Sequence, residues 1–248
     1  MKKKLGIFSV MIFALLIFAS LAIAQQGNKV AVVRGDLSAS TQIMLADLGE
    51  DVDDYQLNAD FGDKLSDYWL IWVGWSNANV TVKSDFKKNQ DKVLEFIKAG
   101  GAFVADTASS NMQEMYEALP GTVRTNNAHG AIETAHIVAL DHPIVNDPND
   151  ITDDKIYSAW AWTAGDRYTE WDGYTIIATE TDKNDSPPLW LVHEEYPVSV
   201  TTIQPTWSGH MKPEIVENIW KYVKNWRAKA VSSKDKLATT WADVKIND

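Results

Sequence analysis

The sequence predicts an α/β fold of three layers, in which a mostly parallel central sheet carries helices on both faces. Two features of the first half support this prediction. Short β-branched or apolar segments alternate with helical ones, and residues 67–74 are nearly all apolar, as in a strand covered on both faces. The second half contains strand-like segments with little helix between them. We therefore expect extra antiparallel strands there, either extending the sheet or forming a small flap.

The clearest helix of the first half is expected over residues 85–99. Val93, Phe96 and Ile97 fall on one face of it, and Gly100-Gly101 ends it. The expected strands of this half cover residues 29–34, 52–57, 67–74 and 102–105, and the other expected helices run from Ser38 or Ser40 to about Leu48 and over 111–118.

The second half is expected to be dominated by strands, which are punctuated by Pro187-Pro188 and Tyr196-Pro197. A last helix begins with Pro213 in its first turn and runs to about Arg227. The expected strands cover residues 131–140, 156–160, 174–179, 189–194 and 198–203.

The chain is expected to hold one large domain between two short terminal segments. Its 248 residues divide into a signal peptide over 1–24, an α/β domain over 29–227, and a linker with a short tail over 228–248. The tail carries one large apolar residue, Trp241.

Composition excludes several classes of function. The chain has no cysteine, which rules out disulfides, thiolate metal sites, iron–sulfur clusters and a cysteine nucleophile. Its net charge of -11 makes it a poor partner for nucleic acid or an anionic membrane surface. We expect neither nucleic acid nor stable membrane insertion after signal cleavage among its partners.

The N-terminus has the layout of a secretory signal peptide. Lys2–Lys4 form a positive region, residues 5–22 are almost all apolar, and Ala22-Ile23-Ala24 is a small-residue cleavage site. An uncleaved membrane anchor is the alternative, since this apolar run nearly has the length to span a bilayer. We expect cleavage, and a mature protein that is secreted, periplasmic or on the cell surface.

Three stretches of the sequence resemble the class I glutamine amidotransferase-like superfamily, especially its trehalose-utilisation-protein-like (ThuA-like) branch. They are the helix ending in Gly100-Gly101 with the strand and turn that follow, the segment Asp141-His142-Pro143-Ile144, and residues 202–207 followed by Pro213-Glu214. The resemblance covers roughly residues 29 to 226. It implies a flavodoxin-like sheet, whose ligands bind at the carboxyl ends of the strands.

The sequence departs from the resembling family at both catalytic positions. The family's catalytic members place a cysteine at the turn after the fourth strand, where this chain has Asp106-Thr107-Ala108. They place a histidine two residues after the glutamine matching Gln204, where this chain has Thr206. The chemistry needs a thiolate activated by an imidazole within hydrogen-bond reach, so glutaminase activity is excluded.

Another nucleophile is a weak alternative. Thr107 and Ser109 lie on or just after the turn, His210 follows the last strand, and Asp106 supplies an acid. No G-x-S-x-G elbow is present, and Ser109 is better explained as a helix cap. We expect no catalytic residue.

Metal and cofactor sites are not expected either. The five histidines form no recognised zinc motif, although a site built from His129, His142 or His210 with an aspartate is conceivable. The acidic segment 146–154 lacks the spacing of a calcium loop and is better explained as a solvated turn.

Eleven tryptophans are the unusual feature of the composition. Trp69, Trp72, Trp190 and Trp220 fall in strands or on a helix and are expected in the core. Trp75, Trp160, Trp162, Trp171 and Trp207 fall at strand ends or in loops, several of them beside polar residues. Such rings suit the apolar faces of sugars, and they also suit simple packing over the sheet rim.

These observations predict an exported, non-catalytic binding or interaction domain, with a neutral carbohydrate or a surface protein as its partner. The expected ligand-binding residues line the rim of the sheet: Trp75, Asp106, Thr107, Ser109, His142, Trp207 and His210. One alternative is a ThuA-like enzyme acting on a carbohydrate through Asp106, His142 and His210. Another is a cell-surface structural component whose tail is an attachment tag.

Export has a direct test. Because cleavage is expected after Ala24, the intact mass of protein recovered outside the cytoplasm should correspond to a chain beginning at Gln25. Full-length chain in the membrane fraction would contradict this expectation.

Overall fold

The computed structural model describes residues 27–33, 40–55, 61–74, 80–106, 112–126, 132–157, 165–183, 185–207, 209 and 211–246. Strands and helices alternate in the first half, as expected. The strands are β1 (Lys29–Val33), β2 (Asp51–Tyr55), β3 (Tyr68–Val73) and β4 (Ala102–Asp106), and the helices are α2 (Ser40–Asp47), α3 (Val80–Lys88), α4 (Gln90–Lys98) and α5 (Gln113–Tyr116), with 3-10 turns η1 (Phe61–Asp63) and η2 (Leu65–Asp67).

The second half adds strands to the same sheet and a small sheet beside it. Its strands are β5 (Arg124–Thr125), β6 (His136–Ile137), β7 (Tyr168–Glu170), β8 (Tyr174–Thr179), β9 (Pro188–His193) and β10 (Val198–Thr201), and its helices are α6 (Pro143–Asn146), α7 (Asp153–Ile156) and α8 (Pro213–Ile246). β5 and β7 pair with each other in a two-stranded antiparallel sheet that the sequence pattern does not predict.

The main sheet has eight strands in the order β2-β1-β3-β4-β10-β9-β8-β6. The first five are parallel to one another, and β9, β8 and β6 follow with antiparallel pairing. The order of the parallel strands along the chain is 2-1-3-4-5, which is the flavodoxin-like order. The predicted fold class is therefore confirmed, and the antiparallel strands extend the sheet.

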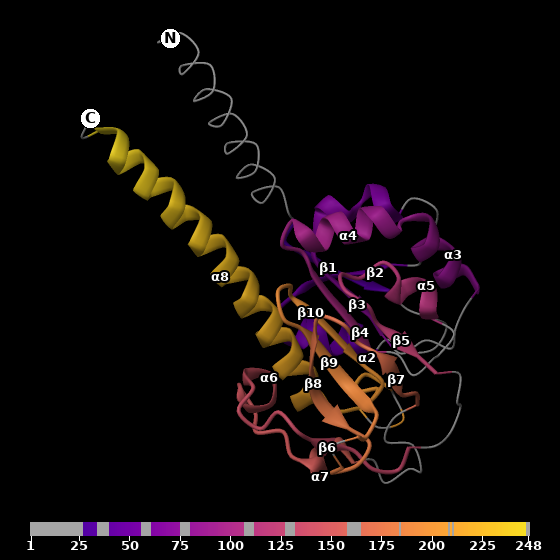
Figure 1. Cartoon of the computed structure of the whole chain (residues 1–248). Helices are drawn as coiled ribbons and strands as arrows, with labels where there is room; N and C mark the ends of the chain where they lie inside the picture. Colours follow the sequence, from indigo (N-terminus) through magenta and orange to yellow (C-terminus); the bar gives the residue numbers. More distant parts are fainter. Residues whose placement is uncertain are drawn as a thin grey trace.

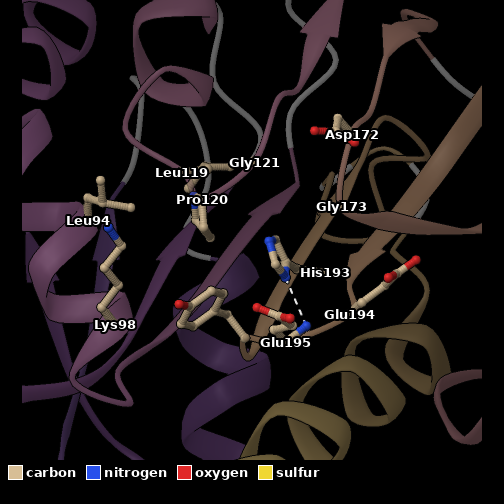
Figure 2. Close-up of a pocket in the computed structure, with 11 residues that line it drawn as sticks. Leu94, Lys98, Leu119, Pro120, Gly121, Asp172, Gly173, His193, Glu194 and Glu195 are labelled. Carbon is tan, nitrogen blue, oxygen red and sulfur yellow. Dashed lines mark hydrogen bonds between the residues drawn. The ribbon is translucent and has the colours of Figure 1, made fainter.

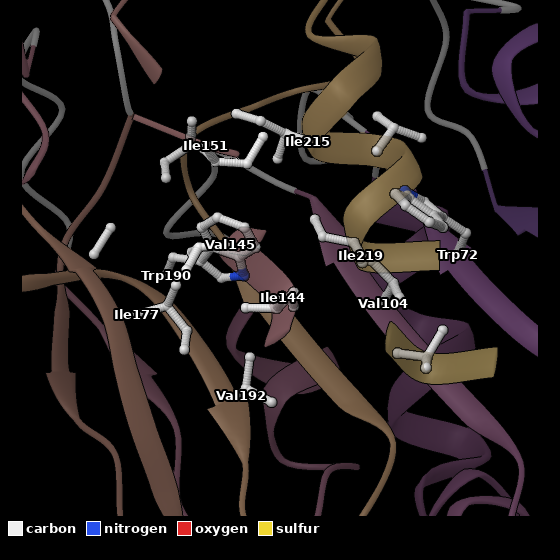
Figure 3. Packing of buried hydrophobic residues seen from close by; sticks show 14 of the residues in the cluster. Trp72, Val104, Ile144, Val145, Ile151, Ile177, Trp190, Val192, Ile215 and Ile219 are labelled. Carbon is white, nitrogen blue, oxygen red and sulfur yellow. The ribbon is translucent and has the colours of Figure 1, made fainter. Parts of the chain in front are cut away.

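Helices cover both faces of the sheet (Figure 1). Residues of β1, β3 and β4 enter two separate hydrophobic clusters, one packed with α2, α6 and α8 and the other with α3, α4 and α5. In the first, Ile215 and Ile219 of α8 lie over Trp72 and Val104 of the sheet (Figure 3). All six residues of β3 are buried, as its continuous apolar sequence predicted.

The tryptophans expected in the core lie there. Trp72 and Trp190 are fully buried, Trp69 is 3% exposed, and Trp220 packs partly buried against the first cluster. The indole N–H groups of Trp69 and Trp220 donate to opposite oxygens of Glu50, at 2.9 and 3.0 Å. Lys224 of α8 donates to the same carboxylate at 2.8 Å, so one acidic side chain fastens α8 to β3.

The helix expected over 85–99 is two helices that meet at Asn89. This side chain is buried, and its amide donates to the Asp85 carbonyl at 2.9 Å, so it competes with the backbone for the helical hydrogen bond. Gly62 lies so close that an added Cβ would be 2.2 Å from the Asn89 side-chain oxygen. The position of the break between α3 and α4 is therefore set by the close packing of Gly62 against Asn89.

The strand expected over 131–140 is present but shorter, since only His136 and Ile137 of its described residues pair with β8. In the strand expected over 156–160, Ile156 instead ends helix α7, and residues 158–160 lie outside the described residues. The Asp153 carboxylate accepts from the Ile137 N–H at 2.8 Å and contacts the His136 ring nitrogen at 2.9 Å. One aspartate therefore occupies the outer edge of β6, where a further strand would pair.

The linker and tail expected over 228–248 are helical as far as Ile246, because α8 continues unbroken from Pro213. The sequence between Pro213 and Ile246 contains no further proline and no glycine, so nothing in it ends the helix. The end of α8 extends beyond the sheet (Figure 1). Within the described part of the chain, no helix is long and apolar enough to cross a membrane.

Candidate functional site

The carboxyl ends of the parallel strands lie along one edge of the sheet, which we call the carboxyl edge. Asp106, the last residue of the central strand β4, lies in the middle of this edge. Asp106 pairs with Thr201 of β10 and is fully buried. Its carboxylate oxygen Oδ2 accepts from the backbone N–H of Thr206 at 2.8 Å and from the Thr206 hydroxyl. Oδ1 has no hydrogen-bond partner among the described residues.

The loop between β10 and α8 turns back toward Asp106 through an unusual backbone conformation. Gln204 has φ of 59°, in the left-handed region that non-glycine residues seldom adopt. The turn is closed by the Trp207 N–H, which donates to the Gln204 carbonyl at 3.1 Å. This places the Thr206 N–H and hydroxyl against β4.

The start of α2 and the residue after β3 also lie close to Thr206. Ser40, the first residue of α2, donates through its hydroxyl to the Thr206 carbonyl. Gly74 follows β3, and a Cβ there would lie 2.6 Å from the Thr41 hydroxyl oxygen. Glycine is thus required for the close approach of β3 to α2 at this edge.

A buried lysine faces the buried acid. Lys212 is 6% exposed, and its ammonium lies 3.4 Å from the Ile203 carbonyl. Burial raises the pKa of Asp106 to about 7, against the opposing effects of Thr206 and the Lys212 charge. Burial likewise lowers the pKa of Lys212 to about 8, against the attraction of Asp106.

Asp166 and the phenols of Tyr116 and Tyr168 are buried near enough to be influenced by the charge of Asp106 or of one another. Asp166 is fully buried, and its backbone carbonyl accepts from the Thr202 hydroxyl at 2.7 Å. The rings of Tyr116 and Tyr168 meet edge to face at 5.9 Å, and burial raises the pKa of both hydroxyls. Lys212 and Asp166 were not identified from the sequence, since neither lies in a recognisable motif.

The structure does not bring His142 to Asp106. His142 caps α6 by accepting from the Ile144 N–H at 3.2 Å, and its ring contacts Tyr222 at 5.1 Å. Tyr222 lies ten residues after Lys212, about 15 Å further along the helix at 1.5 Å per residue. His142 therefore has a structural role at the start of α6, and its part in ligand binding remains a prediction.

Trp207 follows the turn at Gln204, and its side chain is half-buried. A Cβ at Gly209 would lie 3.2 Å from its ring, so the backbone at Gly209 passes close to the ring. The other rim residues named from the sequence, Trp75, Thr107, Ser109 and His210, lie outside the described residues.

The chemistry available at this edge is limited. The hydroxyl of Thr206 is a donor to Asp106. Among the described residues, no group of three or more His, Asp or Glu side chains could hold a metal ion.

Comparisons with known proteins support the fold. No protein-family model matches the chain, and no curated protein matches it. Among solved structures, the chain is similar to a candidate component of GMP synthase from Thermoplasma acidophilum, with a TM-score of 0.57 over 83% of this chain and 98% of that one. At 14% sequence identity, this likeness shows a class I glutamine amidotransferase-like fold.

The buried Asp106 predicts a specific pH dependence of stability. The folded pKa of about 7 lies above the unfolded value of about 3.9, so the folded state retains a proton that the unfolded state has lost. The stabilising contribution is complete below about pH 4 and is lost as the pH rises through about 7.

Asp106→Asn keeps an acceptor for Thr206 and removes this titration. Between pH 4 and 8 the wild type should therefore lose stability that the variant keeps. The free energy of unfolding of the variant relative to that of the wild type should rise by on the order of 2–4 kcal/mol over this range. Urea unfolding at each pH measures it, and Asp51→Asn, which removes an exposed carboxylate, is the control for net charge. A constant difference across this range would contradict the assignment.

Proposed function

We propose that this protein is an exported, non-catalytic binding domain that keeps the amidotransferase-like fold without its hydrolytic chemistry. One observation carries the proposal: Thr206, in the place of the family's histidine, is fully buried and donates its hydroxyl to Asp106. Export rests on the N-terminal sequence alone, which lies outside the described residues.

The Asp106–Thr206 contact is a poor substitute for a nucleophile and its base. A threonine hydroxyl does not take up a proton near neutral pH as an imidazole does, and here it already acts as a donor. Because the chain contains no cysteine, no thiolate can form the thioester that glutamine hydrolysis requires. The enzyme alternative also lacks His142, which caps α6.

A neutral carbohydrate is the proposed ligand of the carboxyl edge. Trp207 is a half-buried aromatic residue at this edge, and stacking on an aromatic ring is a common way to bind the apolar face of a sugar. The net charge of -11 disfavours anionic ligands through long-range repulsion.

Glutamine hydrolysis should be absent. Purified protein incubated with glutamine is expected to release no ammonia above a protein-free blank, because both catalytic groups are missing. Ammonia release that survives purification and disappears in Thr107→Ala would contradict the proposal.

Trp207→Ala should abolish any response of the carboxyl edge to neutral oligosaccharides, followed by tryptophan fluorescence. The substitution should change the free energy of unfolding by no more than about 1–2 kcal/mol, as for a residue at the rim. Trp171→Ala is the matched control, since Trp171 is also half-buried but packs against the other face of the sheet. Unfolding of the Trp207 variant would favour a packing role instead.

A further inference from the structure

A concave site lies at the opposite end of the sheet from Asp106. A cavity of about 480 Å³ opens between the end of α4, the turn at 119–121, the turn at 172–173 and the hairpin after β9. The Phe103 N–H donates to the Pro197 carbonyl of this hairpin at 3.0 Å, which places the hairpin beside the start of β4. β4 runs from Ala102 to Asp106, so the two sites are separated by the length of the strand.

Two glycines shape the wall of this cavity. Gly121 and Gly173 have φ of 74° and 83°, which favour glycine, and a Cβ at Gly121 would lie 2.3 Å from the Asp172 carbonyl oxygen. The two turns are joined by a hydrogen bond of 3.1 Å from the Thr122 N–H to the Asp172 carbonyl. The wall is therefore fixed by backbone contacts.

His193 projects into the cavity from the end of β9 (Figure 2). It is 5% exposed, and its ring lies between those of Tyr174 and Tyr196, with centroids at 4.8 and 5.0 Å. Its Nδ1 accepts from the Glu195 N–H at 3.0 Å. A Cβ at Gly173 would lie 3.4 Å from Nε2, so the absence of a side chain there leaves space beside this atom.

The hydrogen bond at Nδ1 determines what Nε2 can do. Burial lowers the pKa of His193, which favours the neutral ring, and the neutral ring carries its proton on the nitrogen that does not accept. Nε2 is therefore a donor, and it has no hydrogen-bond partner among the described residues. This N–H is not enclosed by protein, so a molecule that enters the cavity can accept a hydrogen bond from it.

The charges around the cavity restrict the ligand further. Asp172, Glu194 and Glu195 contribute carboxylates to the lining, against the single ammonium of Lys98. Carboxylates repel anions and accept hydrogen bonds from hydroxyl groups. Leu94 and the ring of Pro120 supply apolar surface on the other side.

We propose that this cavity binds a neutral, hydroxyl-rich small molecule of the size of a mono- or disaccharide, with His193 Nε2–H as its fixed donor. A hydroxyl group can accept from His193 and donate to Glu195 at the same time, which an ammonium or a carboxylate cannot do. The volume lies within the range of small-molecule sites. The site is separate from the carboxyl edge and does not depend on the function proposed there.

Two substitutions of His193 separate binding from structure. In His193→Asn the side-chain oxygen can still accept from Glu195, but no donor reaches the Nε2 position. In His193→Gln the amide can reach the Nε2 position, but the acceptor for Glu195 is lost. Binding through Nε2 predicts that the Asn variant is the weaker binder, whereas a purely structural role predicts that it is the better one.

The probes are glucose, maltose and glucuronate, titrated into the full mature chain and followed by saturation-transfer NMR. In the Trp207→Ala background, which removes the proposed site at the carboxyl edge, we expect the neutral sugars still to bind. Their affinity should fall about tenfold when His193→Asn is added and stay nearer to that of the background when His193→Gln is added. Leu94→Trp, which fills the cavity from α4 without replacing His193, should also abolish binding.

The results that would overturn the cavity proposal differ from those that would overturn the proposed sugar site at the carboxyl edge. Sugar binding that is lost in Trp207→Ala and retained in both His193→Asn and Leu94→Trp overturns the cavity proposal alone. Tighter binding of glucuronate than of glucose, or no binding of any neutral probe, also overturns it. Binding that is lost in Leu94→Trp and retained in Trp207→Ala supports the cavity and counts against the carboxyl edge.

Discussion

The hydrogen bonds from Thr206 to Asp106 join parts of the chain that are 100 residues apart. They connect the end of β4 to the loop that leads into α8, and Ser40 brings the start of α2 to the same loop. Three segments at the carboxyl edge are thus positioned by a single carboxylate. Its burial is costly, as the raised pKa indicates, so the hydrogen bonds and the nearby Lys212 charge are needed to offset part of that cost.

The carboxyl edge combines the fold of the amidotransferases with a different set of side chains. The polar contact at its centre is the one between Asp106 and Thr206. The amino end of the sheet contains a different kind of surface, with a cavity whose walls are set by glycine turns and whose floor includes a neutral histidine. The two ends of one sheet therefore offer separate surfaces.

The sequence predicted the sheet better than its surroundings, because burial on both faces leaves a continuous apolar run such as 68–73. It could not show that Asn89 would break a helix, since the break depends on a contact with Gly62, which is 27 positions earlier in the chain. It likewise could not show that Asp153 would replace a strand at β6. In the site, the motif identified Asp106 and Thr206, whereas Lys212 became visible only through burial. The sequence also could not show that His142 caps α6, because a helix cap and a ligand-binding residue look alike in sequence.

Aspartate side chains lie at both outer strands of the main sheet, where a further strand would have to pair. At one edge β2 presents the exposed Asp51 and Asp54, and at the other the Asp153 carboxylate already accepts from the backbone of β6. A strand from another molecule could add at either edge only by taking carboxylates out of water or by displacing one from its donor. Addition of a strand from another copy of the protein is therefore disfavoured at both of the described edges.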